Sequence, residues 1–145
     1  MEIFTIGFTR SSAAGFFGRL RAAGIRKLMD VRLNNRSQLA GFAKRDDLAF
    51  FLRELCQASY EHQPLLAPSQ ELLDEFKKHG GAWEDYETRF LQLLAQRRVE
   101  TVLTPVDFTP ATVLLCSEAT AEHCHRRLVV EYLQRHWQDI QPVHL

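Results

Sequence analysis

The amino-terminal part of the chain places two short apolar segments on either side of an amphipathic one. Residues 3–7 form an apolar run that ends in glycine, and residues 25–31 form a second run with charged residues at its exit. Between them, Phe16, Phe17 and Leu20 recur at the spacing of a helix face. A strand, a helix and a strand within about thirty residues are typical of a parallel crossover. This unit predicts a protein of the α/β class.

The later part of the chain continues the alternation of apolar runs and helical stripes. Residues 48–55 and 121–137 carry the apolar stripes of helices, whereas residues 59–62, 113–116 and 143–145 are expected to be short strands. No internal repeat, low-complexity tract or linker divides the sequence. We therefore expect one three-layer α/β domain over all 145 residues, with a mostly parallel sheet flanked by helices.

Charge and cysteine content restrict the possible partners and the compartment. Eighteen basic residues balance eighteen acidic ones, which argues against general nucleic-acid coating but leaves room for a local basic cleft. The three cysteines are an odd number, and the sequence has neither a signal-peptide pattern nor an apolar run long enough to span a bilayer. These features predict reduced thiols in a soluble cytoplasmic protein without a membrane partner. They indicate no particular cofactor or oligomeric state.

The junction after residues 113–116 is the expected location of a site. This apolar run ends in Cys116, and Glu118 follows; the next predicted helix carries Cys124, His125 and Arg126 in its first two turns. In α/β proteins, ligands usually bind where a strand's carboxyl end leads into a helix. The amino end of a helix attracts anions and lowers the pKa of a thiol. The sequence therefore predicts the place of the site but leaves its reaction open.

The cysteines at this junction have two interpretations each. Cys124 is either a nucleophile or metal ligand, or a small residue packed in the core. Cys116 ends an apolar run, so packing is the stronger interpretation unless its side chain points into the cleft. Cys116, Cys124, His125 and His62 are ligand types suited to zinc. However, no Cys-x-x-Cys pair exists, and neighbours on a helix point about 100° apart, so we expect no metal site.

Charged residues near the predicted strand ends complete the candidate site. Arg32 and Arg126 together would form a clamp for a phosphate or carboxylate. Asp30 is expected to orient an arginine, with Arg126 as a candidate, through a salt bridge. Glu118 could act as a general acid or base, or cap the helix, and His62 could transfer a proton or play a structural role.

The sequence also resembles the domain-of-unknown-function 488 family of bacterial and archaeal proteins. Ordered motifs throughout the chain carry the resemblance: Thr5-Ile6-Gly7, Asp30-Val31-Arg32, Ser37, Phe42 with Lys44, Tyr60 with His62, Trp83 with Tyr86, Leu114 to Glu118, Cys124-His125-Arg126, and Tyr132-Leu133. Two positions depart from it: Asn35 stands where many members have proline, and Ala67 where a Leu-Gly pair is common. The resemblance implies a compact α/β fold with a shared polar cleft. The ligand-binding residues that we expect in the cleft are Arg32, Arg126, Asp30, Ser37, Lys44 and His125. The resemblance implies no established reaction.

Two hypotheses from different classes follow. The first is a small cytosolic enzyme with an Arg/Cys/His cleft for a phosphate-bearing or nucleotide-like ligand; the catalytic groups would be Cys124, Cys116, His62 and Glu118. The alternative is a non-catalytic binding module for nucleic acid, a nucleotide or a protein partner, with or without a bound metal. A thiol-redox role is a weaker option, because no Cys-x-x-Cys pair is present to resolve a mixed disulfide. Whether the protein is an enzyme stays open at this point.

Overall fold

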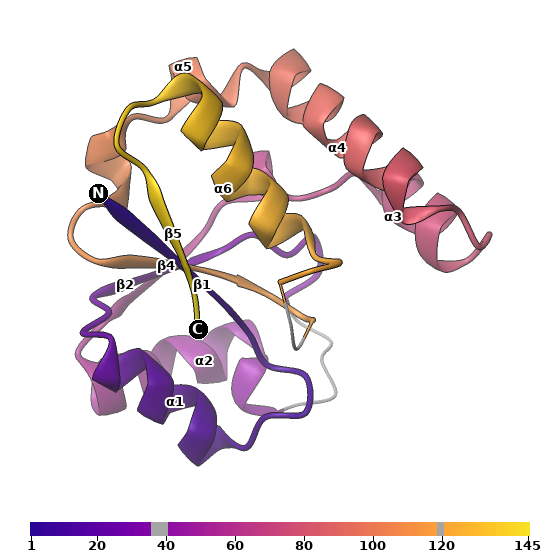
Figure 1. Ribbon diagram of the computed structural model, residues 1–145. Helices are drawn as coiled ribbons and strands as arrows, with labels where there is room; N and C mark the ends of the chain where they lie inside the picture. The colour runs from indigo at the N-terminus through magenta and orange to yellow at the C-terminus, as the bar shows by residue number, and fades with distance from the viewer. Residues whose placement is uncertain (36–40, 119–120) are drawn as a thin grey trace.

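A single parallel sheet organises the computed structural model, which describes residues 1–35, 41–118 and 121–145 (Figure 1). Within these residues the sheet has five strands in the order β3-β2-β4-β1-β5, and every neighbouring pair is parallel. The strands are β1 (Glu2–Gly7), β2 (Lys27–Asp30), β3 (Ser59–His62), β4 (Thr112–Cys116) and β5 (Gln141–His144). The α/β prediction is confirmed, and the mostly parallel sheet is parallel throughout.

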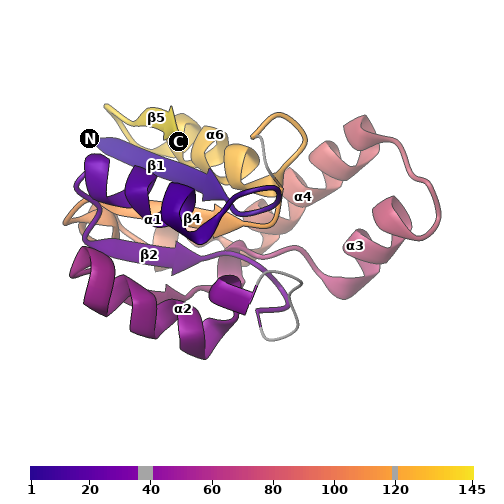
Figure 2. The ribbon, with the colours of Figure 1, turned by 90° about the horizontal axis from the view of Figure 1, so that it is seen from below.

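Helices cover both faces of the sheet (Figures 1 and 2). One face carries α1 (Ala13–Ala22) and α2 (Arg45–Phe51), the latter continued by a π-helical turn, η2 (Leu52–Cys56). The other face carries α4 (Trp83–Arg97), α5 (Val99–Val102) and α6 (His125–His136), and α3 (Gln70–Lys77) packs against α4. Three short 3-10 segments complete the described elements: η1 (Gly41–Ala43), η3 (Pro64–Leu66) and η4 (Pro105–Phe108).

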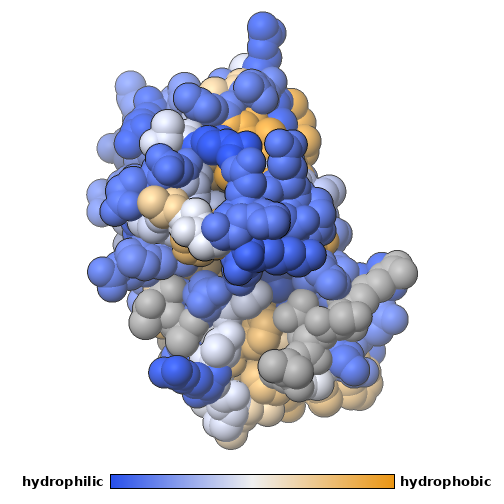
Figure 3. Space-filling model, turned by 90° about the vertical axis from the view of Figure 1, so that its right-hand side faces the viewer, coloured by the Kyte–Doolittle hydropathy of each residue, from blue (hydrophilic) through white to orange (hydrophobic). Residues whose placement is uncertain are grey.

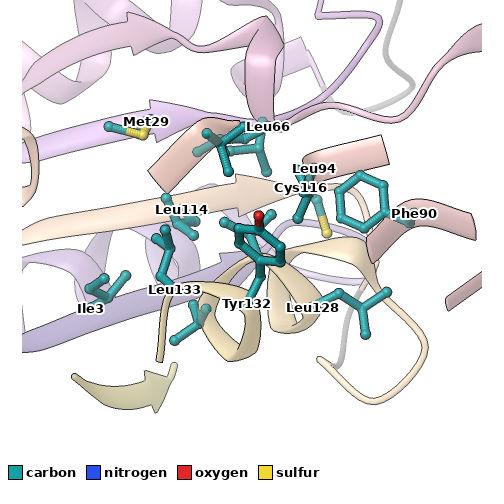
Figure 4. Close-up of a cluster of buried hydrophobic side chains, with 14 of the residues drawn as sticks. Ile3, Met29, Leu66, Phe90, Leu94, Leu114, Cys116, Leu128, Tyr132 and Leu133 are labelled. Carbon is teal, nitrogen blue, oxygen red and sulfur yellow. The ribbon is translucent and has the colours of Figure 1, made fainter. Parts of the chain in front are cut away.

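The central strand β4 supplies side chains to two hydrophobic cores. All five of its residues are buried, and successive side chains of a strand point to opposite faces. Val113 and Leu115 therefore join the core beneath α1 and α2. Leu114 and Cys116 join the core beneath α4 and α6, where Cys116 lies near Phe90 (Figure 4). The apolar run recognised in the sequence is thus a strand covered on both faces.

The register of the strands brings their carboxyl ends to one edge of the sheet. Gly7 of β1 pairs with Cys116 of β4, while Asp30 of β2 pairs with Leu115 of β4 and with His62 of β3. The helical hairpin of α3 and α4 extends beyond this same edge (Figures 1 and 2). Residues far apart in the sequence therefore meet where the strands end.

Helix α6 begins later than the sequence predicts. Its first residue is His125, and Cys124 is its N-cap in an extended conformation, with φ −136° and ψ 139°. Residues 121–124, which the sequence predicts to be the start of this helix, form turns instead. Cys124 consequently stands before the helix rather than in its first turn. None of the described helices is long and apolar enough to cross a membrane.

Candidate active site

A pocket with a volume of about 130 Å³ lies at the carboxyl edge of β2 and β4. The lining residues come from these strand ends, from α3 and α4, and from the segment before α6. The side of the molecule toward which α3 and α4 extend has both hydrophilic and apolar areas (Figure 3). The lining residues are Arg32, Leu33, Asn34, Pro68, Leu73, Phe76, Lys77, Trp83, Tyr86, Cys116, Ser117, Glu118, His123, Cys124 and His125. The predicted junction after β4 is therefore part of a pocket.

Asp30 and Arg32 form a buried, two-pronged ion pair beside the pocket. Arg32 donates from Nε to Asp30 Oδ1 and from Nη2 to Oδ2, both at 2.8 Å, and its backbone N–H donates to Oδ1 at 3.1 Å. The Tyr60 hydroxyl adds a donor to Oδ2 at 2.6 Å, and the ring of Phe8 lies under the guanidinium. Asp30 is fully buried and Arg32 is 3% exposed. Asp30 thus orients an arginine, as expected, and that arginine is Arg32.

The remaining nitrogen of this guanidinium has no partner in the part of the chain that the structure describes. Arg32 Nη1 is buried and forms no hydrogen bond with any described residue. A buried N–H group left without an acceptor costs about 1–3 kcal/mol, and more when the group is charged. Arg32 is also one of the residues that line the pocket, so its guanidinium lies close to any anionic ligand bound there.

Arg126 takes a different place from the one expected. It is 1% exposed and absent from the pocket lining, so it does not form a two-arginine clamp with Arg32. Its Nη1 donates to the Glu118 carbonyl oxygen at 2.6 Å and lies 3.3 Å from Cys116 Sγ and 3.8 Å from Cys124 Sγ. Burial lowers the pKa of Arg126 to about 10, so the side chain remains a cation at neutral pH. This cation lies directly behind the two sulfurs.

Cys116 and Cys124 are joined by a disulfide bond, with their Cα atoms 7.4 Å apart. The expectation of three reduced thiols is therefore wrong for this pair in the structure, and Cys56 is the free cysteine among the described residues. The turn before α6 brings Cys124 back over the end of β4, a return that the sequence did not reveal. A resolving partner for each thiol thus exists without a Cys-x-x-Cys motif. Both cysteines line the pocket.

His125 is held by the end of β2. Its Nε2 lies 2.7 Å from the carbonyl oxygen of Val31, and because a carbonyl only accepts, Nε2 carries the proton and Nδ1 is an acceptor. Burial lowers the pKa of His125 to about 4, the Val31 hydrogen bond opposes this shift, and the charge of Arg126 adds to it. The imidazole is therefore neutral at pH 7.

The position of Cys124 before the helix removes the geometric argument against shared ligation. Two neighbours inside a helix would diverge, but the extended N-cap turns Cys124 toward His125. As a result, ligand atoms from Cys116, Cys124 and His125 all lie within 4.8 Å of one another. The stated physical reason for expecting no metal site does not hold in this structure.

Glu118 lies at the mouth of the pocket. Its carboxylate accepts from Lys77 Nζ at 3.3 Å, and both side chains are about half exposed. Its backbone carbonyl, by contrast, accepts from the buried Arg126. The acid or base role of Glu118 stays a prediction, and Lys77 is a cation at the mouth that sequence reasoning missed.

Two other expected residues that the structure describes, His62 and Lys44, do not line the pocket. His62 Nε2 bonds to the Arg32 backbone oxygen at 2.9 Å, so His62 supports Arg32 from β3 and its catalytic role stays a prediction. Lys44 is the exposed N-cap of α2 and is absent from the lining. Ser37 lies outside the described residues.

An aromatic wall is the main feature that the sequence interpretation missed. Tyr86 is a buried core residue, Trp83 packs against that core, and His123 is exposed. Trp83 stacks on Tyr86 with ring centroids 5.1 Å apart and on His123 at 5.0 Å, and these three residues line the pocket. Phe90 is fully buried in the core. The helical spacing of the aromatics gave no sign that two of them would border a cavity.

The fold and the pocket define a class: a doubly covered parallel α/β domain with a pocket, lined in part by a cysteine pair, at the carboxyl edge of its sheet. Within that class, the family model described as domain of unknown function DUF488 matches residues 12–133. The chain belongs to this family. No curated protein and no solved structure matches the chain.

Proposed function

We propose that this protein is a small enzyme that binds a phosphate-bearing, nucleotide-like ligand in the pocket, with the reaction taking place next to Cys116 and Cys124. The observation that carries the proposal is that Arg32 lines the pocket and has a buried Nη1 without a hydrogen-bond partner among the described residues. The Asp30 pair fixes this guanidinium in place before any ligand arrives. A preoriented donor loses little conformational freedom on binding, which favours affinity for an anion.

The size and lining of the pocket support a ligand with two chemically different parts. A volume of about 130 Å³ is close to the 150 Å³ of an engineered cavity that holds one benzene ring, so a single small group fits inside. We assign that place to the phosphate, between Arg32 and the mouth cation Lys77. Trp83 is stacked on Tyr86 and on His123, so a base would lie against the exposed His123 ring of this stack.

The sulfurs are the reactive groups of the proposal. Arg126 has no carboxylate partner in an ion pair among the described residues, whereas its Nη1 lies 3.3 Å from Cys116 Sγ. In the reduced protein this cation would stabilise a thiolate, which is the form of cysteine that attacks electrophiles and binds metals. Glu118 is placed at the mouth to accept or donate a proton. A cytoplasmic location belongs to the proposal as well, because a reducing compartment maintains free thiols.

Isothermal titration calorimetry with a nucleoside monophosphate, its parent nucleoside and inorganic phosphate tests the proposal. We expect the monophosphate to bind to the reduced protein at least about tenfold more tightly than the nucleoside, because the nucleoside lacks the anion that pairs with Arg32. Lys77→Met should weaken monophosphate binding about fivefold, the effect of about 1 kcal/mol expected for an exposed charge. Lys78→Met is the matched control, because Lys78 is adjacent and absent from the lining.

Two results would contradict the proposal. One is equal affinity for the nucleoside and the monophosphate, and the other is an equal effect of the two lysine substitutions. Binding of the monophosphate without turnover of any phosphate ester or glycosidic bond would favour the non-catalytic binding module instead.

A further inference from the structure

We propose that Cys116, Cys124 and His125 form a binding site for a thiophilic divalent metal ion, such as Zn²⁺, when the cysteine pair is reduced. The three residues line the same pocket that the proposed function uses. This inference rests on the proposed function only for the metal's role in the reaction. Metal binding itself is an independent property of these three residues.

The chemistry of the donor set is that of a zinc site. The three ligand atoms lie within 4.8 Å of one another, and two thiolates with one imidazole are a ligand set used by catalytic zinc enzymes. Such three-ligand sites leave a fourth position for water or substrate. All three residues line the pocket, so this position would face the cavity where we place the phosphate.

The orientation of His125 matches that of a ligand. Metal-binding histidines nearly always donate their other ring N–H to a carboxylate or a backbone carbonyl, which fixes the tautomer. Here Nε2 donates to the Val31 carbonyl oxygen at 2.7 Å. The remaining nitrogen, Nδ1, therefore has the lone pair with which His125 would bind the ion. The backbone of Val31, which precedes Arg32, thus fixes the orientation of the imidazole.

The separation of the cysteine backbones also fits an ion held between the sulfurs. Their Cα atoms are 7.4 Å apart, whereas disulfide-bonded cysteines usually have Cα atoms about 4.4–6.8 Å apart. Two thiolates on one zinc ion, each with a Zn–S bond of about 2.3 Å, lie farther apart than bonded sulfurs do. Reduction by a phosphine and water breaks the S–S bond, leaves two thiols and converts the phosphine to its oxide. Binding of the ion then releases the two thiol protons.

Arg126 completes the surroundings of the site. Its Nη1 is 3.3 Å from Cys116 Sγ and 3.8 Å from Cys124 Sγ, and it also donates to the Glu118 carbonyl oxygen. A guanidinium behind the sulfurs disperses the charge of two thiolates, as outer hydrogen bonds do in zinc sites. The buried cation thereby gains an anionic partner in the reduced, metal-bound state.

Metal titration of the full-length protein tests the inference. Protein reduced with a phosphine and freed of metal by a chelator is titrated with Zn²⁺, and with Co²⁺ as a spectroscopic probe. We expect one ion per chain and sulfur-to-cobalt charge-transfer absorption, both abolished when the disulfide is left intact. Loss of an outer partner of a metal site costs about 10–100-fold in affinity, so Cys124→Ser and His125→Ala should each weaken Zn²⁺ binding more than about 100-fold. Cys56→Ala is the matched control, because Cys56 is buried on the opposite face of the sheet.

Each outcome decides between the alternatives. Stoichiometric binding that is lost in Cys124→Ser and His125→Ala and kept in Cys56→Ala supports the site. Failure of the reduced wild-type protein to bind Zn²⁺ overturns it, and so does tight binding retained in Cys124→Ser; neither result depends on a variant that fails to fold. Titration of the metal-free protein with a nucleoside monophosphate is the separate arm: phosphate binding without metal binding removes this inference and leaves the proposed function standing.

Discussion

Replacing Asp30 by asparagine is expected to lower the free energy of unfolding by about 3–5 kcal/mol. The substitution leaves the Arg32 guanidinium buried without its carboxylate, and breaking one side of a buried ion pair typically has a cost of about this size. It also removes the charged acceptor of the Tyr60 hydroxyl, which lies 2.6 Å from Oδ2. Equilibrium unfolding in urea measures the change.

Two further variants identify the cause of this loss. Asp46→Asn removes a carboxylate that pairs with Arg45 at the surface and is 86% exposed, so it should leave the midpoint of unfolding nearly unchanged. The double substitution Asp30→Leu with Arg32→Met removes both charges and should recover most of the stability lost in Asp30→Asn. If Asp30→Asn unfolds at the wild-type urea concentration, the buried pair does not have the role assigned to it.

Gly7→Ala is expected to destabilise the protein by about 3 kcal/mol, at the upper end of the cost of overpacking. A Cβ atom at this position would collide with the backbone carbonyl of Glu118 and lie 2.5 Å from Arg126 Nη1. Neither group can withdraw freely, because they are hydrogen-bonded to each other at 2.6 Å. Thermal unfolding followed by circular dichroism measures the change.

Gly18→Ala provides a control of opposite sign. Gly18 lies in α1, and a Cβ atom there meets nothing within 4 Å. Alanine is favoured over glycine inside a helix by about 0.5–1 kcal/mol, so Gly18→Ala should stabilise the protein. Equal effects of the two substitutions would show that the close approach at Gly7 does not constrain the site.

Much of the fold could be predicted from the sequence, because the patterns that indicate strands and helices lie within short segments. The apolar run at residues 113–116 is the central strand β4, and the stripe of Phe16, Phe17 and Leu20 is the buried face of α1. Parallel strand ends meet at one edge, so the joint position of Asp30, Arg32 and the β4 junction also followed from the pattern. These features depend on short-range periodicity and on the topology of parallel crossovers.

The geometry of the site depended on contacts that no local pattern encodes. Residues 121–124 form turns, so α6 begins only at His125. This later start places Cys124 next to Cys116 and His125. Because Gly7 has no side chain, the Arg126 guanidinium fits beside it, next to the sulfurs rather than in the pocket. Trp83 and Tyr86 show only helical spacing in the sequence, yet the projection of the α3–α4 hairpin past the sheet makes them a pocket wall. Each of these results comes from the packing of distant segments.

The central claim is that the pocket at the carboxyl edge of β2 and β4 receives the phosphate of a ligand. Two-dimensional ¹H–¹⁵N spectra of the reduced protein, recorded during titration with a nucleoside monophosphate, test it most directly. The account predicts saturable shifts for Arg32 and Cys116, for the Trp83 indole, and for the start of α6, with little change along α1. Shifts centred on α1 and α2, or no shifts at millimolar ligand, would contradict it.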